Sequence, residues 1–136
     1  MFYKNKVVWI TGASSGIGEA LVYELAKQYA IVIISSNQQS ELERVKNNCD
    51  NLKANCFIKY LDVTNAANIN EITNWIIQTF GRIDVLINNA GISQRSLVIE
   101  TPIENDRKIM EINYFGSVLL TKAVLPHMIN QKSGYI

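Results

Sequence analysis

Three glycines with fixed spacing, Gly12, Gly16 and Gly18, follow the first apolar run of the chain. A phosphate held at a protein turn needs backbone N–H donors at a helix N-terminus, space free of Cβ atoms, and close packing of that helix on the preceding strand. The glycines meet all three needs, whereas a plain strand-to-helix turn uses them for geometry alone. The spacing therefore predicts a phosphate-binding turn. Its candidate contact residues are Gly12, Ser14, Ser15, Gly16, Ile17 and Gly18.

Two further groups of candidate residues follow later apolar runs. Asp62 and Val63 come after the run at 56–61, and an Asn-Asn-Ala-Gly motif at 88–91 follows the run at 83–87. In an open α/β sheet, ligands bind outside the carboxyl ends of the strands, so the motif at 88–91 lies where a ligand is expected. The alternatives are a helix-capping acid at Asp62 and ordinary turn chemistry at the asparagines.

Asn113 lies inside a long apolar-periodic segment that predicts a helix. Asparagine is disfavoured there, because its side chain competes for the hydrogen bonds of the backbone. A compensating role in the fold or the site is therefore expected. The alternative is an exposed polar position on a surface helix.

The elements that position these residues alternate along the chain. Four apolar runs are too continuous for a sheet with one wet face, which predicts strands buried on both sides. They lie at 6–11, 30–35, 56–61 and 83–87. Helical stretches follow at 16–28, 40–48, 65–80 and about 103–130, the last with Thr101 as N-cap, Pro102 at the first helical position and Glu104 at the capping-box position. This alternation predicts an α/β fold with a parallel sheet and helices on both faces.

The composition bounds the number of domains and the class of partner. The chain has 136 residues with 48% hydrophobic content, which is enough for one core and too short for two ordinary domains. We therefore place no domain boundary within 1–136. Thirteen basic and twelve acidic residues give a net charge of +1, so the balance indicates neither nucleic acid nor an anionic membrane as a partner.

Cysteine and histidine usage argues against a metal site. Cys49 and Cys56 show neither metal-site spacing nor a disulfide framework, and His127 is the sole histidine. A metal site or a His-dependent triad would lack its usual partners, so we expect no metal. No apolar run approaches the roughly 20 residues that span a bilayer, and no signal peptide is visible. Free thiols suit a reducing compartment, which predicts a cytoplasmic protein.

Four motifs together resemble those of the short-chain dehydrogenase/reductase family. In chain order they are Thr-Gly-x-x-x-Gly-x-Gly at 11–18, Asp-Val at 62–63, Asn-Asn-Ala-Gly at 88–91 and the mid-helix Asn113. The resemblance covers essentially the whole chain, and the segments 93–97 and 110–114 resemble the branch typified by dehydrogenase/reductase family member 7. It implies a Rossmann-type doubly wound parallel sheet and an NAD(P)-dependent oxidoreductase that transfers a hydride between a nicotinamide and a carbonyl or alcohol substrate.

The family's roles carry over where residues match. The loop from Gly12 to Gly18 would hold the pyrophosphate and the adenosine ribose, and Asp62 and Val63 would contact the adenine. Their chemistry agrees, since a carboxylate accepts a hydrogen bond from an exocyclic amino group and a backbone N–H donates to a ring nitrogen.

The later motifs carry supporting roles in the family. The motif at 88–91 would support the central sheet and contact the cofactor, chiefly through Asn89, with Ala90 and Gly91 beside it. Asn113 would be the supporting member of a catalytic tetrad, because in the family this asparagine distorts its helix and holds a water in the proton relay.

The choice between NAD and NADP depends on the end of the second strand. A carboxylate there binds the ribose hydroxyls of NAD, and a basic residue pairs with the 2′-phosphate of NADP. Ser36 and Asn37 occupy these positions and carry neither charge. Since no carboxylate repels the phosphate, the sequence favours NADP, with NAD as the alternative.

The last residues, Tyr135 and Ile136, resemble the opening of a fifth strand. The family's catalytic Ser and Tyr-x-x-x-Lys would lie beyond Ile136, so we expect the 136-residue polypeptide by itself to show no reductase turnover. An intact parent is expected to be a homodimer or homotetramer, because in the family the helix that contains Asn113 and the next long helix form the subunit interface. The alternative function is a non-catalytic nucleotide-binding or scaffold protein.

Overall fold

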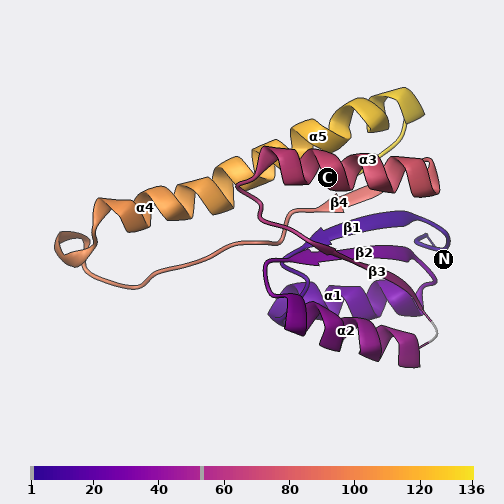
Figure 1. Cartoon of the computed structure of the whole chain (residues 1–136), viewed down its shortest axis with the longest axis horizontal. Coiled ribbons are helices and arrows are strands. Elements are labelled where there is room, and N and C mark those ends of the chain that lie inside the picture. The colour runs from indigo at the N-terminus through magenta and orange to yellow at the C-terminus, as the bar shows by residue number, and fades with distance from the viewer. Residues whose placement is uncertain (1, 53) are drawn as a thin grey trace.

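The computed structural model describes residues 2–52 and 54–136. A parallel sheet with the order β3-β2-β1-β4 lies between two helical layers (Figure 1). Its strands are β1 (Val7–Thr11), β2 (Ile31–Ser36), β3 (Asn55–Tyr60) and β4 (Val85–Ile87). On one face lie α1 (Gly16–Lys27) and α2 (Gln39–Asn51), and on the other lie α3 (Ala66–Phe80) and α5 (Ser117–Gln131). The doubly wound parallel sheet predicted from the sequence is confirmed.

The central strand β1 divides its side chains between two apolar layers. Val8 and Ile10 pack in the cluster that includes α1 and α2, whereas Val7 and Trp9 pack in the cluster that includes α3 and α5. This alternation follows from the period of two in a pleated strand. Every residue of β1 is buried, because a helical layer covers each face of the sheet.

The strand β3 lies at an edge of the sheet, and the prediction that all four strands are buried on both sides is wrong there. Only Cys56 of β3 is fully buried. Phe57 is partly exposed and packs against Trp75 and Phe80 of α3, with ring centroids 6.1 and 5.2 Å apart. A continuous apolar run does not distinguish such an edge strand from a central one. An edge strand also needs apolar residues where aromatic side chains of a helix pack against it.

The segment predicted as one helix over 103–130 is continuous but irregular. The helix α4 (Ile103–Met110) passes into a π-helical segment, η2 (Glu111–Gly116), and then into α5. Figure 1 shows α4 projecting beyond the sheet on the side where the strands end. None of the helices in the described part of the chain is long and apolar enough to cross a membrane.

The predicted N-cap of this helix is wrong. Pro102 is the N-cap residue, and no side chain caps the helix. The Thr101 hydroxyl instead donates to the Leu97 carbonyl at 2.9 Å. A 3₁₀ turn, η1 (Val98–Glu100), precedes the helix, and Leu97 is its N-cap residue. Because the Thr101 hydroxyl is bonded to the Leu97 carbonyl, it does not cap the free N–H groups of α4.

A buried carboxylate joins β4 to β1. Asp84, which is 3% exposed, accepts a hydrogen bond from the Val7 N–H at 2.8 Å and from Arg82 Nε at 2.9 Å. On the other side of β4, Tyr135 forms a parallel bridge to Val85, where the fifth strand was expected to open. These contacts fix the position of β4 in the sheet, so the loops that follow β1 and β4 emerge side by side.

We expect Asp84→Ala to lower the free energy of unfolding by about 3 kcal/mol, because the Val7 N–H and the Arg82 guanidinium lose a buried acceptor. Urea unfolding followed by circular dichroism measures the change. Asp50→Ala is the matched control, since Asp50 pairs with Lys46 on the surface of α2, and we expect it to cost less than about 0.5 kcal/mol. Equal effects of the two substitutions would contradict the role given to Asp84.

Candidate functional site

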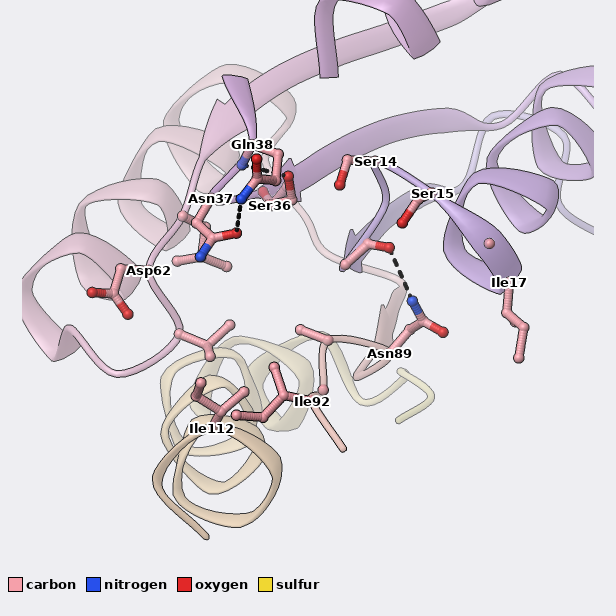
Figure 2. Close-up of a pocket in the computed structure, with 17 residues that line it drawn as sticks. Ser14, Ser15, Ile17, Ser36, Asn37, Gln38, Asp62, Asn89, Ile92 and Ile112 are labelled. Atoms are coloured by element: carbon pink, nitrogen blue, oxygen red, sulfur yellow. Dashed lines mark hydrogen bonds between the residues drawn. The ribbon is translucent and has the colours of Figure 1, made fainter. Parts of the chain in front are cut away.

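A cavity of about 430 Å³ opens at the carboxyl ends of the strands. Figure 2 shows Ser14 and Ser15 across this cavity from Ile92 and Ile112. Residues predicted from the sequence supply most of its lining. The predicted residues that line it are Gly12, Ser14, Ser15, Gly16, Ile17, Ser36, Asn37, Asp62, Val63, Asn89, Ala90 and Gly91.

The glycine turn presents unpaired backbone donors at the N-terminus of α1. Among the described residues, the N–H groups of Ser14, Ser15 and residues 16–18 have no hydrogen-bond partner. Gly12 and Gly16 adopt φ values of 63° and 55°, in the left-handed region that residues with a Cβ rarely adopt. The free N–H groups and the positive end of the helix dipole together favour an anion at this turn.

Gly18 lies outside the cavity lining and packs directly behind the turn. A Cβ at Gly18 would lie 2.2 Å from the Gly12 carbonyl oxygen and 2.6 Å from Asn89 Nδ2. Gly12 is confined as well, because its Cβ would lie 2.8 Å from Ala90 Cα. The absence of these two side chains lets α1 and the segment at 88–91 approach the end of β1 together.

Thr11, which was not among the predicted site residues, joins the glycine turn to the motif at 88–91. Its Oγ1 accepts hydrogen bonds from the N–H groups of Asn89 and Ala90 at 3.2 and 3.1 Å. Asn89 Nδ2 in turn donates to the carbonyls of Thr11 and Gly12, each at 3.1 Å, the second drawn in Figure 2. A threonine directly before the glycine turn was the available signal, although its partners are 78 and 79 residues away.

Asp62 places a carboxylate at the cavity. Its Oδ1 accepts hydrogen bonds from the Thr64 hydroxyl at 2.7 Å and the Thr64 N–H at 2.9 Å. These bonds, the hydroxyl's first, hold the pKa of Asp62 below its ordinary value, so the group is ionised at neutral pH. The N-cap of α3 is Asn65, whose side chain accepts from the Asn68 N–H, so the interpretation of Asp62 as the helix cap is wrong.

Apolar side chains form the wall opposite the turn. Leu61 and Val63 follow β3, and Ile112 reaches the cavity from η2, with Ile92 beside it. Leu61, Ile92 and Ile112 were not among the predicted site residues. Ile112 lies in a segment for which the sequence predicted only an apolar-periodic helix, and its approach to the cavity depends on the tertiary fold.

Asn113 lies in the π-helical segment and binds the backbone that follows the motif at 88–91. Its Oδ1 accepts from the Ile92 N–H at 2.9 Å, and its Nδ2 donates to the Ile92 carbonyl at 2.8 Å. Asn113 is exposed, yet both polar ends of its side chain are bonded, which compensates its poor helix propensity. It does not line the cavity and instead holds the segment that does.

The end of the cavity near β2 is polar and uncharged. The Ser36 hydroxyl accepts from the Gln38 N–H at 3.0 Å, and Gln38 Nε2 donates to Asn37 Oδ1 at 3.4 Å (Figure 2). No basic side chain is among the described residues that line the cavity, and Asp62 is its only carboxylate. The end of the cavity near β2 can therefore bind a ribose, or a group attached to it, through hydroxyl and amide groups.

The chain matches the family model described as short chain dehydrogenase over residues 6–136. The chain belongs to the short-chain dehydrogenase family. It is 49% identical over 136 residues to human dehydrogenase/reductase SDR family member 7, an alignment that covers 97% of this chain and 40% of that relative. The predicted family and its branch are confirmed. The chain thus spans less than half the length of this relative.

Two solved structures of similar fold were determined with a nicotinamide cofactor. NAD⁺-bound xylitol dehydrogenase aligns with a TM-score of 0.93 and 27% identity, covering 98% of this chain and 52% of that one. A metagenomic short-chain oxidoreductase in complex with NADP aligns with a TM-score of 0.92 and 25% identity, covering 98% of this chain and 61% of that one. The fold that this chain shares with them therefore occurs with either cofactor.

We expect Thr11→Val to lower the free energy of unfolding of this short-chain dehydrogenase by about 2 kcal/mol, because a methyl group replaces the hydroxyl that accepts from Asn89 and Ala90. Thermal or urea unfolding measures the loss. Thr11→Ser is the control, since it keeps the hydroxyl and removes only a methyl group. If the serine variant were the less stable of the two, packing at Thr11 and not its hydrogen bonds would join the motifs.

Proposed function

We propose that this short-chain dehydrogenase is an NAD(P)-dependent oxidoreductase and that the cavity holds the dinucleotide. The observation that carries the proposal is the run of unpaired N–H groups from Ser14 to Gly18 at the N-terminus of α1. A pyrophosphate bears the charge and the acceptor oxygens that such a run of donors binds. Family membership and the cofactors named with the two similar structures support the same conclusion.

The remaining cavity residues suit the rest of the cofactor. The ionised Asp62 is an acceptor for the exocyclic amino group of adenine, and Val63 and Ile112 provide apolar surface for its ring. Ser36 and Asn37 offer hydrogen bonds to the adenosine ribose. A dinucleotide bound in this way would run from the end of β2, across the turn, toward the segment at 88–91.

The nicotinamide supplies the hydride chemistry when the cofactor is bound, and we propose a carbonyl or alcohol compound as substrate. The residues of this chain bind and orient. The turn holds the phosphates, Asn89 keeps the turn in place, and Asn113 holds the Ile92 segment at the cavity. We propose that Asn113 has a supporting role in proton transfer. Its position outside the cavity lining agrees with such a role.

We further propose NADP as the preferred cofactor and a homodimer or homotetramer as the assembly. The missing carboxylate at Ser36 and Asn37 supports the first. Exposed apolar side chains along α4 and α5, among them Met110 and Ile129, support an interface there. The cytoplasm stays the proposed location, on the basis of free thiols.

We expect the purified protein to bind both NADPH and NADH, with Gly18→Val weakening both at least about tenfold because its side chain has no space beside Gly12. Isothermal titration calorimetry measures the affinities, and circular dichroism checks that the variant is folded. Gly81→Ala is the control: it strains a left-handed residue with open space around it, at the end of α3. A parent protein that binds neither nucleotide would refute the proposed function.

A hydride-transfer assay distinguishes an oxidoreductase from the alternative function, a non-catalytic nucleotide-binding or scaffold protein. A protein that binds the nucleotide but transfers no hydride to or from any of a broad panel of carbonyls and alcohols would be a nucleotide-binding or scaffold protein.

The preference for NADP has its own test. We expect Asn37→Asp to weaken NADPH binding by about tenfold or more and to leave NADH binding unchanged or improved, because the new carboxylate repels the 2′-phosphate. Asn47→Asp adds the same charge on the exposed surface of α2 and should change neither affinity. If the parent protein binds NADH tightly and NADPH negligibly, NADP is not the preferred cofactor.

A further inference from the structure

Arg44 on α2 lies behind the glycine turn and is held by several hydrogen bonds. Its Nη1 and Nη2 donate to the two oxygens of Glu19 at 2.7 and 2.8 Å, and its Nε donates to Glu41 at 2.9 Å. Nη2 also donates to the Ser14 carbonyl at 3.1 Å. Arg44 therefore connects α1, α2 and the turn through one rigid guanidinium group.

A chain of polar contacts orients Glu19 for this role. The Tyr23 hydroxyl donates to Glu19 Oε1 at 2.7 Å, and Asn48 Nδ2 donates to the Tyr23 hydroxyl at 2.9 Å. The Arg44 guanidinium holds the pKa of Glu19 below its ordinary value, so the ion pair persists at neutral pH. Attachment at both carboxylate oxygens fixes the plane of the guanidinium, which a single contact would not do.

The bond to Ser14 determines the orientation of the next peptide unit. The described chain contains no cis peptide bond, so the Ser14 carbonyl and the Ser15 N–H point in opposite directions. The carbonyl points toward Arg44, and the Ser15 N–H therefore points away from it. That N–H has no partner among the described residues, and Ser15 lines the cavity.

Arg44 itself is poorly suited to bind a phosphate. Two carboxylates, from Glu19 and Glu41, surround its single positive charge. Arg44 is also not among the residues that line the cavity. The direct link from Arg44 to the cavity lining is therefore its bond to the Ser14 carbonyl, which belongs to the Ser14–Ser15 peptide.

We propose that Arg44 is a positioning residue that fixes this peptide so that the Ser15 N–H faces an oxygen of the bound dinucleotide. Without Arg44, the peptide is free to rotate and to present a carbonyl oxygen to the anion in place of a donor. This inference rests on the function proposed above, since it assigns Arg44 to the binding of the same cofactor.

The test is the affinity of the purified protein for NADPH and NADH, measured by calorimetry for the parent protein and for Arg44→Gln. We expect both dissociation constants to rise by about tenfold and by the same factor, because both cofactors share the pyrophosphate and the adenosine. Lys46→Gln is the matched control. It removes a positive charge from the same helix, where Asp50 is the one partner of Lys46 in the described part of the chain, and should change neither affinity.

Each other outcome overturns the inference in a recognisable way. Unchanged affinity in Arg44→Gln would show that the turn keeps its shape without the arginine. A loss confined to NADPH would make Arg44 a direct ligand of the 2′-phosphate and not a positioning residue. Failure of the parent protein to bind either cofactor would refute the proposed function, and this inference with it.

A spectroscopic measurement on the parent protein keeps the test valid if Arg44→Gln does not fold. With ¹⁵N-labelled serine, we expect ADP to shift the Ser15 amide resonance, and we expect Glu19→Gln to reduce this shift and the affinity together. If Arg44→Gln does fold, the double variant should bind no more weakly than Arg44→Gln alone, because both changes break one network. A Ser15 resonance that ADP leaves in place would overturn the proposal.

Discussion

The crowding of three backbone segments at the end of β1 determines the shape of the site. A side chain at Gly18 would collide with the Gly12 carbonyl, so α1 begins closer to the strand than any other residue would allow. The Asn89 side chain fills the space that remains and donates to the carbonyls of Thr11 and Gly12. Those carbonyl oxygens are thereby engaged, and the helix N-terminus is left with N–H groups facing an anion.

The strand order of the sheet brings the three segments at the end of β1 together. The strand β1 lies between β2 and β4, so its carboxyl end is adjacent to both the polar residues after β2 and the motif after β4. Asp84 ties β4 to β1 at the opposite end. The π-helical segment contributes Ile112 to the cavity wall, and Asn113 of the same segment bonds to Ile92. The strand order and these two contacts therefore place the glycine turn, the motif at 88–91 and the π-helical segment at the same edge of the sheet.

Features encoded within a few residues were predictable from the sequence. The turn from Gly12 to Gly18 follows from the spacing of its glycines after an apolar run, and the resemblance to the family adds Asp62 and Asn89. All of them reach the cavity or its immediate support. The position of Thr11 directly before the glycine turn was a signal, but its partners and those of Arg44 were not predictable. They lie far away in the chain, and their approach depends on how strands and helices pack. The prediction of Thr101 as the N-cap of α4 was wrong because the sequence did not predict the 3₁₀ turn before the helix. At the start of that turn, the Leu97 carbonyl accepts the hydrogen bond of the Thr101 hydroxyl.

We propose that the cavity beside the glycine turn is a dinucleotide site. A crystal structure of the protein with NADPH tests it most directly. We expect electron density for the pyrophosphate within hydrogen-bond distance of the N–H groups at the start of α1, with the adenine between Asp62 and Ile112. Density for the nucleotide at any other place on the protein, with the turn free of phosphate, would contradict it.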